Sequence, residues 1–184
     1  MKTKLITLFW VLAGALSLLG AVEVDGVIGK NEYVNRQELN GNAFVLHWQI
    51  EGDTIYFAIE STAKGWVSIG FEPTKIMANA DMVFGIIGDK VQAVDAYSTG
   101  QFGPHPADTD QGGKDSLLAF AGKRSAGGVV FEFSRKLDTG DSKDKPIIVG
   151  KELKLIWAWS NSLAFNAKHR SEEHTSELQS RQVI

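Results

Sequence analysis

Residues 65–81 read GWVSIGFEPTKIMANAD, and this stretch decides the fold. It opens as a strand over residues 66–71, in which alternate side chains point to opposite faces. Pro73 then ends the strand, because proline has no N–H to donate to a neighbouring strand. A short loop presents Met77 ahead of Asp81, and an apolar run over residues 82–87 follows at once. The stretch therefore predicts two neighbouring strands, with a thioether held on the loop between them.

Alternation of apolar and polar residues continues through most of the chain. Runs with a period of two are found at residues 44–50, 55–60 and 129–134, and further strands are expected at residues 91–97, 117–121 and 153–160. Tight turns join several of them, and no later stretch shows helical periodicity over three turns. This pattern predicts an all-β fold, an antiparallel two-sheet β-sandwich of the immunoglobulin-like type. We expect a short edge strand within residues 25–33 and a long irregular loop over residues 98–114.

The composition is that of an ordinary globular domain. The chain has 184 residues, of which 43% are hydrophobic, and its net charge is −3. One domain of this size buries a substantial core, and without a basic excess we expect no nucleic-acid partner. The absence of cysteine excludes disulfides, thiolate haem ligation, covalent c-type haem and iron–sulfur clusters. Catalytic signatures such as a nucleophile elbow are missing too, so we do not expect an enzyme.

The first 21 residues have the pattern of a secretory signal peptide. Lys2 and Lys4 precede an apolar run from Leu5 to Leu19, and small residues follow at positions 20 and 21. The alternative is an uncleaved membrane anchor, but the run is shorter than the roughly 20 apolar residues that a spanning helix needs. We therefore expect a mature protein that is periplasmic or secreted and that has no membrane attachment after cleavage.

The segments Gly65-Trp66-Val67, Gly70-Phe71 and Met77-Ala78-Asn79-Ala80-Asp81 together resemble the core motif of DOMON domains. Residues 133–141, FSRKLDTGD, resemble another stretch of that family. In its haem-binding members, including the cytochrome domain of cellobiose dehydrogenase, the methionine of this motif is an axial ligand of haem b. The resemblance implies a DOMON-type sandwich over residues 22–169.

The same resemblance implies a cofactor and a function. The second axial ligand in the haem-binding members is a histidine near the C-terminal end, and His169 stands in that place. A haem b held by Met77 and His169 transfers single electrons, which requires a redox partner protein that the sequence does not identify. Lys168 is the alternative to His169, and an extended segment would turn the two to opposite faces. The expected apolar lining of the site is Phe71, Ile76, Trp157 and Trp159, and the expected propionate partners are Arg135, Lys136 and Lys168.

Other interpretations of the same residues remain open. A sandwich that binds no haem, and takes a sugar or another ligand instead, is the main alternative, because aromatic faces stack on sugar rings. The tryptophans in the strands are equally compatible with core packing, and an accessory subunit of a larger oxidoreductase is a third reading. We expect His47 to be a solvent-facing residue of a sheet and His105 to be a loop residue.

The last segment, residues 170–184, differs from the rest. It contains RSEEHTSELQS, which resembles the translation of a sequencing adapter, and it has no β alternation. We expect this tail to be an assembly artefact that makes no contact with the sheets.

Overall fold

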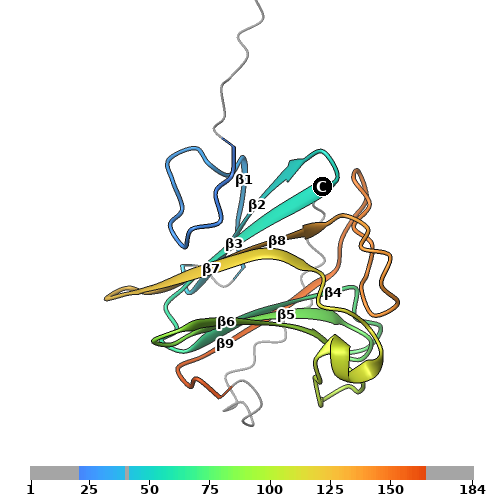
Figure 1. The fold of residues 1–184 in the computed structure, drawn as a ribbon. Coiled ribbons are helices and arrows are strands. Elements are labelled where there is room, and N and C mark those ends of the chain that lie inside the picture. Colours follow the sequence, from blue (N-terminus) through green and yellow to red (C-terminus); the bar gives the residue numbers. More distant parts are fainter. Residues whose placement is uncertain (1–20, 40–41, 165–184) are drawn as a thin grey trace, which may run out of the picture.

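The computed structural model describes residues 21–39 and 42–164, which form two sheets stacked face to face (Figure 1). The first sheet has the strand order β1-β2-β3-β8-β7 and the second the order β6-β5-β4-β9, with all neighbours antiparallel. This confirms the predicted two-sheet β-sandwich. The strands are β1 (Asn35–Glu38), β2 (Phe44–Glu51), β3 (Thr54–Ser61), β4 (Trp66–Phe71), β5 (Asp81–Ile87), β6 (Val91–Tyr97), β7 (Leu117–Ser125), β8 (Gly128–Lys136) and β9 (Leu155–Ser160).

The core lies between the two sheets and follows the predicted alternation. In β4, Val67, Ile69 and Phe71 point into it, and each is completely buried. The Phe57 ring of β3 lies 5.4 Å from the Phe71 ring and 5.2 Å from the Phe133 ring, measured between centroids. Aromatic pairs at this spacing add packing energy to the burial of their area. The period of two in the sequence thus sets which side chains join the sheets.

The segment before β1 crosses the outer face of the five-stranded sheet, where Tyr33 packs against the buried Ala58. The Glu132 carboxylate accepts hydrogen bonds from the Tyr33 hydroxyl, at 2.7 Å, and from the Gly26 N–H, at 2.6 Å. The prediction of an edge strand within residues 25–33 is wrong. The Gly26 N–H and the Tyr33 hydroxyl donate to the Glu132 side chain of β8, and the segment does not pair with a neighbouring strand in the described part of the chain. The same cover buries His47, which was expected to face solvent; its Nε2 lies 2.6 Å from Glu60.

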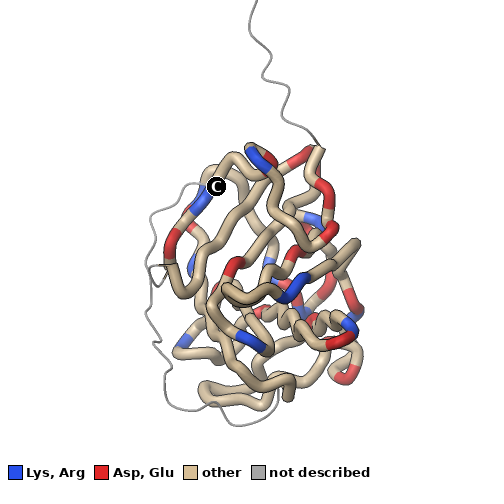
Figure 2. The backbone as a smooth tube through the Cα atoms, turned by 90° about the vertical axis from the view of Figure 1, so that its left-hand side faces the viewer, with Lys and Arg blue, Asp and Glu red and all other residues tan. Residues whose placement is uncertain are grey.

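The predicted long loop joins β6 to β7 and contains a short 3₁₀ helix, η1 (Asp108–Gln111). No helix in the described ranges has the length and apolar character needed to cross a bilayer. In the view of Figure 2, basic and acidic residues are scattered along the backbone, and both signs are present. The expected signal peptide, His169 and the tail lie outside the described residues, apart from Ala21.

Gly85 in β5 provides a test of how closely the sheets pack. A Cβ at this position would lie 2.2 Å from the Phe131 ring across the core, which is far inside contact distance. We expect Gly85→Ala to lower the free energy of unfolding by about 1–3 kcal/mol in urea denaturation, as overpacked cores do. The control is Gly127→Ala in an exposed turn, where the nearest atom is 3.7 Å away. Equal stability of the two variants would contradict this account of the core.

Candidate functional site

The loop that carries Met77 is held by its own backbone. The Thr74 N–H donates to the Ala78 carbonyl at 2.9 Å, and the Ala80 N–H donates to the Met77 carbonyl at 3.1 Å. The loop after β6 lies alongside, with the Asn79 N–H donating to the Ser98 carbonyl at 3.0 Å. Two loops therefore support each other at the end of the four-stranded sheet where β5 begins and β6 ends.

Met77 packs against a second apolar cluster, which lies on the outer face of the four-stranded sheet. We call this cluster the outer apolar face; its buried members are Trp66, Ala80, Met82, Phe84, Ile86, Ala96 and Ile156. The His105 ring lies 5.9 Å from the Phe84 ring, so the long loop also reaches this face. The Ser68 hydroxyl is fully buried on the same side of β4 and has no hydrogen-bond partner among the described residues. The outer apolar face therefore combines hydrophobic side chains, a thioether and a polar atom whose bonding is unsatisfied.

The expected lining residues are divided between the two faces of this sheet. Phe71, Trp157 and Trp159 belong to the core between the sheets, with the Trp157 and Trp159 rings 6.4 Å and 6.0 Å from that of Phe44. The four-stranded sheet separates them from Met77. Ile76 is half-buried and directly precedes Met77 in the loop. The structure thus brings Ile76 and Met77 together, places the three aromatic residues elsewhere, and does not describe His169.

The two described cations that were expected to meet propionates bind carboxylates of the chain. Arg135 is 1% exposed and donates from Nη1 to the Asp81 Oδ2 at 2.6 Å. Lys136 lies on the surface, and its Nζ is 2.6 Å from the Asp53 Oδ2. Both side chains therefore have partners before any ligand is considered.

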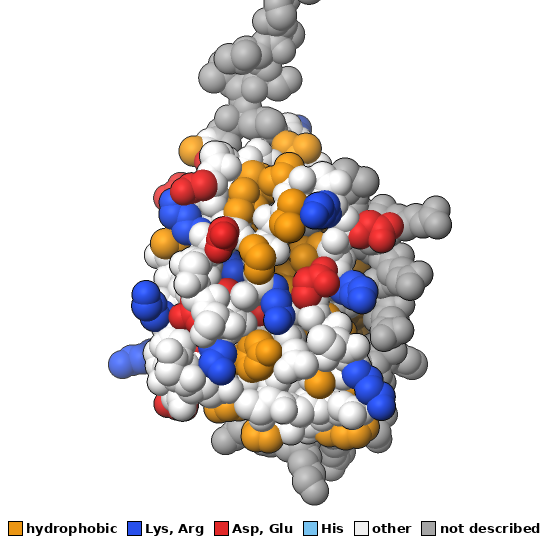
Figure 3. All heavy atoms as spheres, turned by 90° about the vertical axis from the view of Figure 1, so that its right-hand side faces the viewer, with side chains coloured by type: hydrophobic (Ala, Val, Ile, Leu, Met, Phe, Trp, Pro, Cys, Tyr) orange, Lys and Arg blue, Asp and Glu red, His pale blue; other side chains and the backbone are white. Residues whose placement is uncertain are grey.

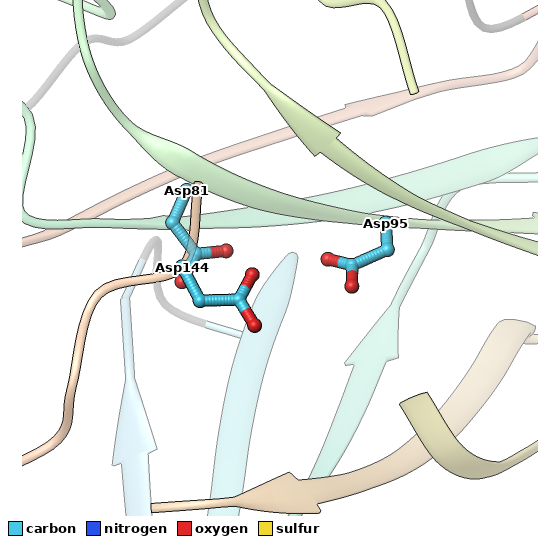
Figure 4. Close-up of side chains that lie close together, drawn as sticks. All are labelled: Asp81, Asp95 and Asp144. Carbon is cyan, nitrogen blue, oxygen red and sulfur yellow. The ribbon is translucent and has the colours of Figure 1, made fainter. Parts of the chain in front are cut away.

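Arg135 leads to a second constellation, a cluster of acidic side chains between the sheets. Asp81 and Asp95 point inward from β5 and β6, and Asp144 approaches from the loop after β8 (Figure 4). One carboxylate oxygen from each lies within 4.8 Å of the other two. We call these three residues, together with Asp108 of η1, the acid cluster. The face of the molecule shown in Figure 3 carries hydrophobic side chains between separate charged ones. The four acids of the cluster are buried.

Hydrogen bonds satisfy only part of the acid cluster. The Asp81 Oδ2 accepts from Arg135 and from the Lys145 N–H, and the Asp95 Oδ2 accepts from the Ser116 N–H at 2.8 Å. The Asp144 Oδ2 accepts from the Thr139 hydroxyl and lies 3.7 Å from the Arg135 Nη2.

Several oxygens of the acid cluster have no partner at all. Asp81 Oδ1, Asp144 Oδ1 and both carboxylate oxygens of Asp108 are buried without a hydrogen bond within the described part of the chain. Such atoms are costly to bury unless something else binds them.

Burial and mutual repulsion shift the ionisation of these groups. Burial raises the pKa of Asp95 to about 8, and the negative charges of Asp144 and Asp81 add to the shift. Burial likewise raises the pKa of Asp108 to about 7, again assisted by Asp144 and Asp81. Burial alone would lower the pKa of Arg135, but the Asp81 carboxylate reverses this effect and raises it. The guanidinium therefore stays charged.

Sequence reasoning singled out Asp81 as part of a motif and Asp108 as part of a loop, and it missed the cluster. One signal was present: Asp95 follows Val91 and Ala93 on the inward-facing side of β6, where a carboxylate is unexpected. Asp144 gave no such signal, because it belongs to a charged loop without periodicity. Only the fold brings that loop to the ends of β5 and β6.

Replacing Arg135 tests how much the acid cluster depends on one cation. Arg135→Met leaves the Asp81 carboxylate buried and unpaired, so we expect the free energy of unfolding to fall by about 3–5 kcal/mol. Lys136→Met removes the neighbouring cation from an exposed pair and should cost at most about 1 kcal/mol. Urea denaturation of both variants measures the difference. Losses of the same size would show that the buried pair has no special role.

The raised carboxyl pKa values predict that stability depends on pH. Above about pH 4, Asp95 holds a proton in the folded chain up to about pH 8 and Asp108 up to about pH 7, and both release it on unfolding. In buffer with a chelator, the free energy of unfolding should fall as pH rises through this window, by up to about 1.4 kcal/mol per pH unit per proton. The other charged groups around them are Asp141, Arg135, Lys143 and Lys145.

The control for this pH dependence replaces both acids. The double variant Asp95→Asn/Asp108→Asn should give a flatter profile in urea denaturation from pH 5 to 8, because asparagine does not titrate. A wild-type stability that rises with pH over this range would mean that the two carboxyl groups are ionised throughout.

Comparisons with known proteins agree with the sandwich and with its motifs. Similarity reaches 34% identity over 114 residues with mouse DBH-like monooxygenase protein 1, covering 62% of this chain and 18% of the relative. The human protein of that name is 32% identical over 136 residues (72% and 21%), and the chicken protein 29% over 143 residues (77% and 22%). The chain thus spans about a fifth of the length of these curated relatives. The DOMON domain family matches residues 40–160, so the chain belongs to the DOMON domain family.

Proposed function

We propose that this DOMON domain binds haem b at the outer apolar face and transfers single electrons to a redox partner protein, without catalysing a reaction itself. The observation that carries the proposal is the position of Met77, which packs against seven buried apolar residues outside the core between the sheets. A porphyrin needs an apolar surface, and a thioether at its edge is a suitable axial ligand for iron. When bound, the haem would supply a one-electron redox centre.

The donor set of the described residues fits one side of such a site. Met77 provides the sulfur, and Ile76 beside it adds apolar surface. In this proposal the outer apolar face lines the haem, in place of Phe71, Trp157 and Trp159, which were expected from the sequence to line it. The buried Ser68 hydroxyl would lie beneath the bound group. The propionates would then need cations other than Arg135 and Lys136, and Lys168 remains the predicted candidate.

His169 can serve as the second ligand only if the chain turns back after β9. Ser160, the last residue of β9, pairs with Trp66 at the start of β4, whereas Met77 follows the far end of β4. The nine residues from 160 to 169 reach at most about 30 Å, and a six-residue strand is about 20 Å long. The chain is therefore long enough for such a return along the outer apolar face. Among the described histidines, His105 is the next candidate for the second ligand.

We further propose that residues 1–21 direct secretion, so that the domain works in the periplasm or outside the cell. The apolar run behind two lysines supports this, as set out from the sequence. A chain found in the cytoplasm after fractionation of expressing cells would contradict it.

A second candidate function is that of a ligand-binding domain which binds no haem. Mouse and human DBH-like monooxygenase protein 1 match this chain over about a fifth of their lengths. In this alternative the domain is one part of a longer protein. A sugar is the less suitable ligand, because Trp48, Trp66 and Trp157 are each less than 8% exposed and offer no open ring face for stacking.

The test is the absorption spectrum and redox titration of the full chain expressed with a haem supply. We expect a low-spin haem b spectrum in the wild type. Met77→Ala should shift it towards high spin and lower the potential, because the sulfur that favoured ferrous iron is gone. His169→Ala should weaken haem retention further. Met82→Leu is the matched control, since it keeps the outer apolar face hydrophobic and should leave the spectrum unchanged.

Each outcome decides between the two functions. A wild type that takes up no haem would overturn the electron-transfer proposal and leave the ligand-binding one. If Met77→Ala retains a wild-type spectrum while Met82→Leu changes it, the axial sulfur belongs to Met82. If His169→Ala is silent and His105→Ala is not, the second ligand is His105.

A further inference from the structure

We propose that the acid cluster is a calcium site, in which Asp81, Asp95, Asp108 and Asp144 bind one Ca²⁺ at the end of the sandwich. Asp81, Asp95 and Asp144, from β5, β6 and the loop after β8, carry the oxygens that lie close to one another, and Asp108 of η1 lies beside Asp144. The cation would tie the β6–β7 loop and the loop after β8 to the four-stranded sheet. It would bind whether or not the outer apolar face holds a haem.

The spacing of the carboxylates suits a single ion. Calcium takes oxygen ligands at about 2.3–2.6 Å, so two ligands on opposite sides of one ion lie at most about 5 Å apart. The oxygens of Asp81, Asp95 and Asp144 all lie within 4.8 Å of one another. In Figure 4 the three carboxylates are directed into one common space from two sheet strands and a loop. An ion there could contact all three without a large rearrangement.

Asp108 gives independent support for a ligand. Its side chain is completely buried, neither carboxylate oxygen meets an N–H or hydroxyl donor within the described ranges, and its nearest polar neighbour is the Asp144 carboxyl group. The carboxylates of Asp144, Asp81 and Asp141 lie around it, and their negative charges add to the effect of burial in raising its pKa. Hydrogen-bonded acid clusters that serve only the fold satisfy their oxygens, and this residue leaves two open.

The charge of the cluster supports a divalent ion. Four carboxylates lie against Arg135, the cation that pairs with Asp81 and approaches Asp144. The nearby Lys143 and Lys145 ammonium groups lie over the Tyr97 ring, at 5.2 Å and 5.6 Å from its centroid. Arg135 compensates one of these charges, and a divalent cation would compensate the others when all four carboxylates are ionised.

The type of ligand and its arrangement favour calcium over other divalent ions. Every donor is a carboxylate oxygen, which excludes a preference for zinc or copper. Magnesium requires a near-ideal octahedron at short distances, whereas calcium accepts irregular sets of six to eight oxygens. Donors from four separate elements form an irregular set, and carboxylates can bind through one oxygen or two.

Thermal unfolding of the full chain tests this site, with excess CaCl2 compared with EDTA. Calcium at about 100 times its dissociation constant should raise Tm by about 5–10 °C, because it binds only the folded state. Asp108→Asn and Asp95→Asn should lose most of this shift. In EDTA both variants should melt at or above the wild type, since asparagine needs no proton to be buried without charge. Asp89→Asn, an exposed acid in the β5–β6 turn, should behave like the wild type.

Several results would overturn the proposal. The first is a wild type whose Tm is the same in CaCl2 and in EDTA. The second is an equal rise in Tm with MgCl2, or with NaCl at matched ionic strength. The third is a full calcium-dependent rise in Tm in both Asp108→Asn and Asp95→Asn. Calorimetric titration of CaCl2 into chelator-treated protein provides a second measurement that does not involve unfolding. It should show one site per chain in the wild type and in Asp89→Asn, and a loss of affinity of at least about tenfold in Asp108→Asn.

Discussion

The ion pair between Arg135 and Asp81 joins the two sheets through two buried charges. Arg135 comes from β8 and Asp81 from β5, and both are essentially inaccessible to solvent. The guanidinium also donates to the Lys145 carbonyl at 3.2 Å and lies 5.7 Å from the Phe71 ring centroid. A buried pair of this kind contributes little net stability by comparison with apolar residues, but either charge alone would be very costly. It therefore specifies which strands face each other at this end and where the following loop must pass.

The same pair links the two candidate sites. Asp81 ends the Met77 loop and begins β5, so its backbone bounds the outer apolar face while its side chain enters the acid cluster. Residues 81 and 82 point to opposite sides of one sheet, one to a polar and the other to an apolar environment. A single strand thus supports two chemically different constellations that are separated only by the thickness of the four-stranded sheet.

The fold could be predicted from the sequence because strand alternation is local information. Trp66 and Val67 were assigned to opposite faces from their parity, and the structure places them in different apolar clusters. The contacts of residues 22–34 could not be predicted in this way, since Glu132 binds Gly26 and Tyr33 from 106 and 99 positions away. The site was predictable only to the extent that a motif names Met77. Whether Trp157 and Trp159 lie on the same face as Met77 depends on strand pairing, which the sequence does not specify. The acid cluster depends on loops that have no periodic signal.

The attachment of the N-terminal segment to Glu132 also has a consequence for the order in which the protein folds. Gly26 and Tyr33 leave the ribosome early, but Glu132 is synthesised 106 and 99 residues later. Contacts over such long separations form slowly, because the intervening chain must first be brought together. Until β8 pairs with β3, the early segment has no native partner for these groups. We therefore expect a nascent chain of this protein to remain incompletely folded until most of its length has emerged. During that interval it depends on protection from aggregation.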